Sequence, residues 1–151
     1  MAGQQHRNDD WTGTAPVRFA AVTVITSKTA NALIEDAEVN ALGRLAAQTS
    51  SGSTRWIDRS RQRYGGLWVG GRLTLTTTTV EFHPNTANRS LQNGSLDVVL
   101  ALRHVESVEL MPGLVTKIVV VRTPDRVLSA RCFGAAKLAD QIRSAADAAH
   151  G

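Results

Sequence analysis

The chain has little cysteine and no long hydrophobic run. One Cys among 151 residues excludes an internal disulfide framework and any zinc site built from several cysteines. No stretch approaches the roughly 18 consecutive apolar residues that a membrane span needs. The N-terminus also lacks the basic start, apolar core and cleavage site of a secretory signal. We therefore expect a cytoplasmic protein, which could associate with a membrane only peripherally.

Catalytic and metal-binding patterns are missing as well. His6, His83, His104 and His150 do not form the His-x-x-x-His or Glu-x-x-His spacings of metal sites. The glycine pairs at 65–66 and 70–71 belong to no Gly-x-x-x-x-Gly-Lys phosphate loop. Without a nucleophile held beside a base, the sequence predicts no enzymatic activity, no metal and no cofactor.

The single thiol fits a buried position. Cys132 shares one face of a predicted strand with Ala130, whereas Arg131 and Phe133 point to the other face. Free cysteine is among the most buried residue types, so we predict a small core side chain rather than a reactive thiol.

What is present is the composition of an ordinary globular domain. With 42% apolar residues, 20% charged residues and four Pro, the chain is neither disordered nor fibrous. Its 151 residues suffice for one domain with a core and are too few for two. We predict a flexible tail over residues 1–15 and a single domain over residues 16–150.

The net charge of +4 is concentrated in the segment from Arg55 to Arg72, which holds five arginines and one acid. The general interpretation of such a charge run is a solvated basic strip. The alternative hypothesis is that it binds a phosphorylated lipid headgroup or an acidic protein, because arginine pairs with phosphate and carboxylate in a bidentate way. The candidate binding residues are Arg55, Trp56, Arg59, Arg61, Arg63 and Arg72.

The first half of the domain shows two patterns in turn. Residues 17–26 are rich in β-branched side chains and predict a strand. In residues 27–48, apolar side chains recur every three or four positions, which predicts an N-terminal helix. Residues 49–63 show no period and predict a loop longer than usual.

From Tyr64 to Phe133 the pattern changes to period two. Gly70-Gly71 is a tight hairpin signal, and Asn93-Gly94 is a second turn signal. Further strands are predicted at 96–102, 105–110, 117–122 and 126–133. Residues 134–149 then carry an apolar stripe of helical period. The predicted fold class is mainly β, an antiparallel barrel or sandwich of about seven strands with a capping C-terminal helix.

The segment from Gly71 to Asn85 resembles the signature of GRAM domains, which belong to the pleckstrin-homology-like (PH-like) superfamily. The resemblance covers about residues 60–148 and implies a PH-like barrel that ends in a helix. It also implies a binding scaffold that recognises lipid headgroups in some members and proteins in others. The matching residues, all structural, are Gly71, Leu73, Leu75, Thr76, Val80, Phe82 and Pro84.

Three binding roles stay open at this point. The first is a PH-like module that recognises a protein or an anionic lipid. The second is nucleic-acid binding, which the arginines favour, although aromatic residues do not interleave with them as stacking platforms require. The third is an assembly module in which an exposed sheet edge accepts a partner's strand. Trp68 is interpreted as a residue of the β-structure, because Leu67 and Val69 flank it.

Overall fold

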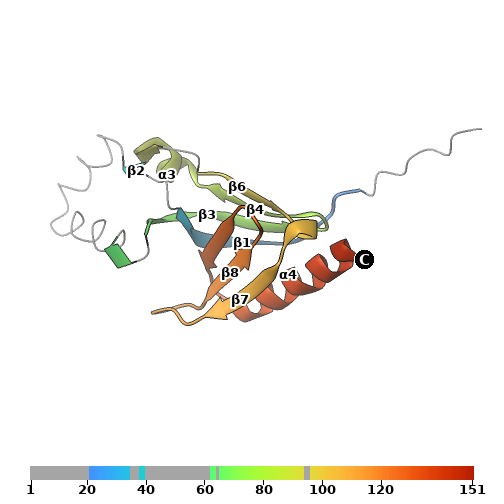
Figure 1. Cartoon of the computed structure of the whole chain (residues 1–151). Coiled ribbons are helices and arrows are strands. Elements are labelled where there is room, and N and C mark those ends of the chain that lie inside the picture. The colour runs from blue at the N-terminus through green and yellow to red at the C-terminus, as the bar shows by residue number, and fades with distance from the viewer. Residues whose placement is uncertain (1–20, 35–37, 40–61, 64, 94–95) are drawn as a thin grey trace, which may run out of the picture.

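The computed structural model describes residues 21–34, 38–39, 62–63, 65–93 and 96–151. Its main feature is a seven-stranded antiparallel sheet in the order β6-β4-β3-β1-β9-β8-β7 (Figure 1). The strands are β1 (Val24–Ile34), β3 (Leu67–Thr76), β4 (Thr79–Pro84), β6 (Val98–Ala101), β7 (Ser107–Met111), β8 (Ile118–Arg122) and β9 (Val127–Arg131). The predicted fold class is confirmed, but the sheet is open between β6 and β7 and is not a closed barrel.

Shorter elements complete the described part of the chain. The helix α3 (Thr86–Leu91) follows β4, and the 3-10 turn η1 (Leu102–His104) joins β6 to β7. The two-residue strands β2 (Glu38–Val39) and β5 (Gln92–Asn93) pair with each other. The predicted turn at Asn93-Gly94 falls partly outside the described residues, and α3 was not predicted.

Asn85 explains where α3 begins. Its side-chain Oδ1 accepts a hydrogen bond from the backbone N–H of Asn88 at 2.9 Å, as an N-cap residue does. The sequence signal was therefore present in Asn85, because asparagine is among the preferred N-cap residues.

The C-terminal helix α4 (Ala135–His150) is confirmed, with bounds close to those predicted. It packs on β7, β8 and η1, below the sheet in Figure 1. Its buried residues are Ala135, Leu138, Ala139, Ile142 and Ala146. Because three of these five are alanine, the helix backbone can approach the sheet closely. None of the helices in the described ranges is long and apolar enough to cross a bilayer.

The prediction of a helix beginning at residue 27 was wrong. Residues 27–34 belong to β1, which lies at the centre of the sheet and pairs with both β3 and β9. Ala30, Ala32 and Ile34 alternate as buried residues along it, so the same apolar positions satisfy period two. Pairing with two neighbouring strands overrides the weak helical pattern. Of the rest of the predicted helix, residues 38–39 form the strand β2, and residues 35–37 and 40–48 lie outside the described residues.

The prediction of a hairpin at Gly70-Gly71 was also wrong. Both glycines lie inside β3, and the turn to β4 occurs at Thr77–Thr78. A Cβ atom on Gly71 would lie 2.3 Å from the carbonyl oxygen of His83, so β4 approaches the backbone too closely for a side chain. Glycine therefore marks a close strand contact here, rather than a turn.

Threonine chemistry forms the actual turn. The Oγ1 atom of buried Thr76 accepts hydrogen bonds from the backbone N–H groups of Thr78 and Thr79, at 3.1 and 2.9 Å. This side chain replaces missing backbone partners in the turn. Although threonine is typical of strands, the middle of the threonine run 76–79 supplies the turn.

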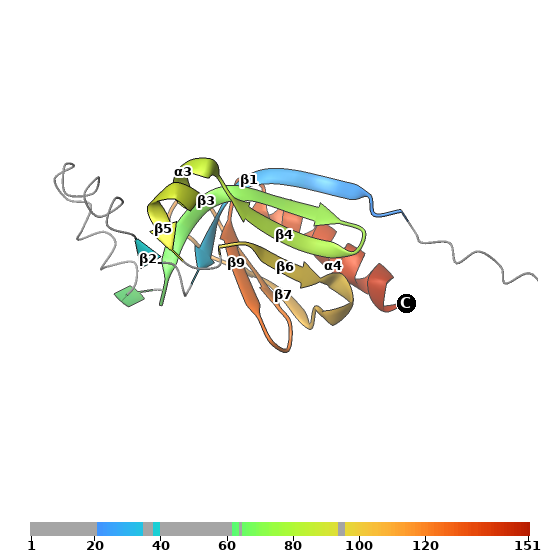
Figure 2. The same ribbon diagram turned by 90° about the horizontal axis from the view of Figure 1, so that it is seen from above.

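The core lies between the curved sheet and α4 (Figure 2). Of the residues that carry the GRAM resemblance, Leu73, Leu75, Val80 and Phe82 are all buried within 1% exposure, as predicted for core positions. Cys132 is buried beside them in the same cluster, on the face that also holds Ala130. The predicted alternation is confirmed, since Phe133 points outward with 81% of its surface exposed.

Candidate ligand-binding surfaces

Most of the predicted binding residues fall outside the described part of the chain. Arg55, Trp56, Arg59 and Arg61 belong to the segment 40–61, so their role stays a prediction. Arg63 is described and exposed. Trp68 is buried in β3, under the guanidinium of Arg131, whose Cζ lies 4.4 Å from the centre of the indole ring. Its interpretation as a residue of the β-structure is confirmed.

Arg72 is the best defined of the predicted binding residues. It lies on the outer face of β3, between Thr29 of β1 and His83 of β4. Its Nη1 atom donates to Ser27 Oγ at 3.3 Å, and Ser27 Oγ lies 3.2 Å from Thr74 Oγ1. Arg72 is thus exposed and held over a polar sheet face.

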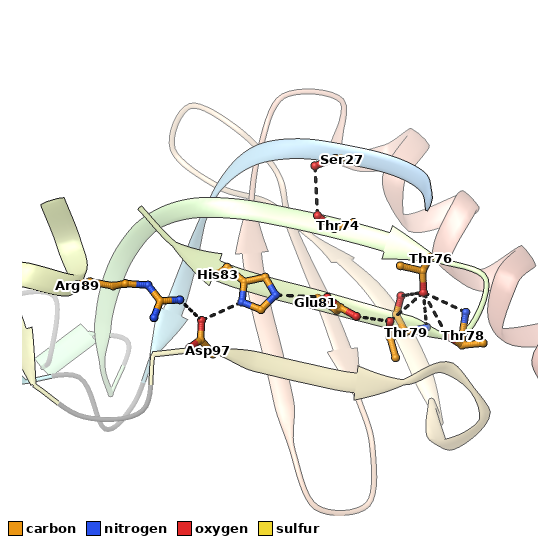
Figure 3. Close-up of polar contacts among 9 residues, drawn as sticks. All are labelled: Ser27, Thr74, Thr76, Thr78, Thr79, Glu81, His83, Arg89 and Asp97. Carbon is orange, nitrogen blue, oxygen red and sulfur yellow. Dashed lines mark hydrogen bonds and ion pairs between the residues drawn. The ribbon is translucent and has the colours of Figure 1, made fainter. Parts of the chain in front are cut away.

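A chain of polar contacts crosses this face beside Arg72 (Figure 3). Arg89 of α3 donates to Asp97 Oδ1 at 2.5 Å, and the same oxygen lies 2.9 Å from His83 Nδ1. The other ring nitrogen, Nε2, lies 3.3 Å from Glu81 Oε2. Thr79 Oγ1 donates to Glu81 Oε1 at 2.6 Å. We call Glu81, His83, Arg89 and Asp97 the ionic clasp, since they join α3, β4 and the start of β6.

The clasp shifts the ionisation of its own members. Hydrogen bonding to Asp97 is the largest cause that raises the pKa of His83, and Glu81 adds to it. Hydrogen bonding to His83 lowers the pKa of Asp97, while hydrogen bonds from Thr79 and then His83 lower the pKa of Glu81. Each charged form therefore stabilises the others.

This geometry favours an ion-pair clasp rather than a catalytic pair. A histidine that acts as a base needs one nitrogen free for a nucleophile or a substrate proton. Here both ring nitrogens of His83 face carboxylates. Burial raises the pKa of the Cys132 thiol, which works against its reactivity. Among the residues that the structure describes, no group of three or more His, Cys, Asp or Glu is placed to hold a metal ion.

A different surface, which the sequence interpretation missed, lies at one end of the sheet. The loop between β7 and β8 carries Leu114 and Val115 at its tip, with 86% and 87% of their surfaces exposed. Strand register links Met111 to Ile118 and Ile118 to Arg131, two residues before exposed Phe133. We call Leu114, Val115 and Phe133 the apolar tip, because register places all three at the same end.

The tip has positive rather than negative charge around it. Lys117 is exposed, and no acid occurs between residues 110 and 118. The nearest acid along β7, Glu109, is paired with Arg122 at 3.2 Å. The start of α4 contributes Lys137, while Asp140 is paired with Arg143 at 2.8 Å. The lysines next to the apolar tip are therefore not neutralised by these acids.

The strand register places the strand ends on either side of the segment 40–61 away from the apolar tip. Asn31 of β1 pairs with Arg131 on one side and with Gly70 of β3 on the other. Leu33 pairs with Ser129, so the end of β1 at Ile34, next to Leu67 of β3, lies toward the start of β9 and away from Phe133. The signal that could have identified the apolar tip is the Leu114-Val115 pair directly after Pro112-Gly113.

Comparisons with known proteins identify a similar structure but no family. No family model matches the chain, and no curated protein matches it either. Among solved structures, the chain is similar to the Vps36 N-terminal PH domain, with 10% identity and a TM-score of 0.48. The match covers 83% of this chain and 80% of that one. The description of the fold rests on the strand order, the register and the C-terminal helix.

Proposed function

We propose that this protein is a non-catalytic PH-like binding module of the GRAM type that attaches peripherally to an anionic membrane surface. The observation that carries the proposal is the apolar tip, where Leu114 and Val115 are adjacent and 86% and 87% exposed. Large apolar side chains at the end of a turn have no partner within the described part of the chain. Their burial in a lipid interface would remove this exposed surface from water.

The free energies of apolar burial and of charge attraction favour insertion of this loop into a membrane over its exposure to water. Complete burial of a leucine or valine side chain contributes about 1.5–3 kcal/mol. Each lysine or arginine near an anionic surface adds about 1 kcal/mol. Leu114, Val115 and Phe133, with Lys117 beside them, would together suffice for reversible attachment.

The predicted arginines fit the same proposal. Lipid phosphates would be bound by Arg55, Arg59, Arg61 and Arg63, while Trp56 enters the membrane interface. Arg72 would bind a further phosphate from the sheet face. The support is the charge of the segment together with the exposed position of Arg72 on the polar face of the sheet. In this proposal, arginines supply the electrostatic attraction and the tip supplies the apolar insertion.

Co-sedimentation of the full chain with vesicles tests this function. We expect binding to phosphatidylcholine vesicles in which about 30% of the lipid is phosphatidylserine, and little binding to vesicles of phosphatidylcholine alone. The double variant Leu114→Ser/Val115→Ser should weaken binding about tenfold or more. Val127→Ser is the matched control, because Val127 is also exposed but pairs with Arg122 at the opposite end of β8 and β9. Replacing Arg59, Arg61 and Arg63 with Ser should weaken binding and reduce its salt dependence.

Two results would contradict the membrane proposal. The first is wild-type protein that does not bind anionic vesicles at low salt. The second is a tip variant that binds as well as wild type. In the first case, affinity capture of a protein partner becomes the next experiment. Strong, salt-sensitive binding to single-stranded or duplex nucleic acid, unaffected by the tip variant, would favour the nucleic-acid role.

A further inference from the structure

The strand β1 is covered on both sides over only part of its length. It pairs with β3 from Val24 to Ile34, whereas β9 pairs only with Asn31, Ala32 and Leu33. Beyond Phe133 the chain turns at Gly134, which has a φ of +70°, and continues as α4. Within the described ranges, the β9-facing edge of residues 24–30 therefore carries no strand. Figure 2 shows β1 extending well past β9.

A groove of about 480 Å³ lies between this edge and α4. Ile25 forms one wall, and the pairing of β1 with β3 shifts by one residue at this position, as in a β-bulge. The facing wall is one side of α4, with Ser144, Ala145 and Ala148 as its small residues. The groove thus combines apolar and small side chains with the polar side chains of Lys137, Asp140 and Gln141, next to a strand edge.

The other edge next to α4 is closed. Arg143 donates from Nε and Nη2 to the carbonyl oxygen of Val108 in β7, at 3.2 and 2.9 Å. A charged side chain on an edge carbonyl blocks the addition of another strand. Within the described residues, no charged side chain is hydrogen-bonded to a carbonyl of residues 24–30, and the lysine on this edge, Lys28, has its Nζ on the carbonyl oxygen of Phe133.

Lys137 and Asp140 line the groove, and the charge around them is positive because Arg143 and Lys28 lie beside it. Asp140 is held by Arg143 at 2.8 Å, whereas Lys137 has no ion pair among the described residues. Lys28, in the middle of the open edge, donates from Nζ to the carbonyl oxygen of Phe133 at 3.3 Å. A second copy of the chain paired along this edge would bring two Lys28 side chains together. Charge complementarity therefore favours an acidic occupant.

We propose that residues 24–30 of β1 accept an extended, acidic segment of a partner protein as an added strand. Its main chain pairs with the open edge, its alternate apolar side chains enter the groove beside Ser144 and Ala148, and its carboxylates face Lys28 and Lys137. This inference goes beyond the membrane proposal. Lys137 lies near both surfaces, but the groove contains neither Leu114 nor Val115, so variants at these residues and at Ser144 let each proposal fail separately.

The test uses the full chain and two synthetic octapeptides. Both alternate valine with threonine, and the central threonines are replaced by glutamate in one peptide and by lysine in the other. We expect the glutamate peptide to slow hydrogen exchange of the backbone amides in residues 24–30, and to bind about tenfold more tightly than the lysine peptide, or about 1.4 kcal/mol.

Three variants make the result specific to the groove. Ser144→Trp fills the groove and should abolish binding of the glutamate peptide, whereas Asp147→Trp adds the same side chain on α4 at a residue that does not line it. Lys137→Glu should reduce the preference for the glutamate peptide. Circular dichroism and thermal unfolding establish that each variant is folded.

Three outcomes would overturn the proposal. One is unchanged exchange in residues 24–30 at about 1 mM peptide, a concentration at which even a weak complex with a Kd near 1 mM is half formed. Another is equal binding by the wild type and the Ser144→Trp variant. The third is protection of residues 24–30 that depends on protein concentration without peptide and disappears in Ser144→Trp. That result would identify a second copy as the occupant.

Discussion

The Nδ1 atom of His83 lies 2.9 Å from the Oδ1 atom of Asp97, and this contact joins β4 to the start of β6. The two residues are 14 positions apart in the sequence. Arg89 and Glu81 extend the contact into the ionic clasp, so one histidine connects two strands and a short helix. Its protonation state consequently affects the stability of this side of the sheet.

The clasp predicts a pH dependence of stability. The raised pKa of His83 means that its contribution is complete below its unfolded pKa, near 6.5, and is lost as the pH rises through the higher folded pKa. The lowered pKa values of Asp97 and Glu81 mean that their contributions exist above their unfolded values, about 4, and are lost as the pH falls through the folded values. The clasp should therefore stabilise the protein most between about pH 4.5 and 6.5.

Urea denaturation of His83→Gln at pH 5.5 and pH 8.5 checks this prediction. Because the partners are partly exposed, the variant should lose only about 0.2–1 kcal/mol relative to wild type at pH 5.5, and less at pH 8.5. His104→Gln is the control, since His104 is exposed and lies outside the clasp. A larger loss at pH 8.5 than at pH 5.5 would contradict the sign of the shift.

The two glycines of β3 should respond differently to the same substitution. Gly71→Ala places a Cβ atom 2.3 Å from the carbonyl oxygen of His83 and 2.7 Å from the Cα atom of Pro84, both of them backbone atoms. We expect it to reduce the free energy of unfolding by about 1–3 kcal/mol. In Gly70→Ala the nearest atom is the side-chain Nδ2 of Asn88 at 3.1 Å, which can move. Thermal unfolding of both variants should rank Gly71→Ala as clearly less stable, and equal stability would show that β4 can shift.

Thr76 should be essential to the β3–β4 turn. Thr76→Val keeps the shape of the side chain but leaves the N–H groups of Thr78 and Thr79 without their Oγ1 acceptor. We expect a loss of about 1–2 kcal/mol in chemical denaturation. Thr78→Val is the matched control, with an expected change within about 0.5 kcal/mol, because Thr78 is exposed. Similar losses in the two variants would indicate that the hydroxyl of Thr76 does not organise the turn.

The thiol of Cys132 should be unreactive in the folded protein. Its side chain is 5% exposed and its pKa is raised by burial, so the thiolate is scarce at neutral pH. An aromatic disulfide reagent at pH 8 should react with the native protein at least about a hundredfold more slowly than with the protein unfolded in about 6 M guanidinium chloride. Equal rates in both conditions would mean that the end of β9 opens readily.

Local patterns in the sequence were sufficient to predict an element where its apolar residues follow a single period and face a single environment. The helix α4 could be predicted because its apolar stripe has a single period and faces a single surface. The late strands could be predicted because their alternation matches one buried and one exposed face, as with Ala130, Cys132 and Phe133. These features depend on side chains close in sequence, which the sequence itself displays.

The tertiary structure alone decided which segments pair and pack with residues distant in the sequence. The sequence of residues 27–34 fits both a helix and a strand, and the pairing of β1 with β3 and β9 selected the strand. The Gly70-Gly71 pair is typical of a turn, but Gly71 lies inside a strand, where the backbone of His83 and Pro84 leaves no room for a side chain. The ionic clasp and the groove beside β1 likewise join residues far apart in the chain.

The sequence by itself determined the alternating core, the single thiol and the C-terminal helix, because local periodicity sets which side chains are buried. The partners of each strand and the apolar tip were decided by packing, because a local pattern does not specify which distant surface will cover it.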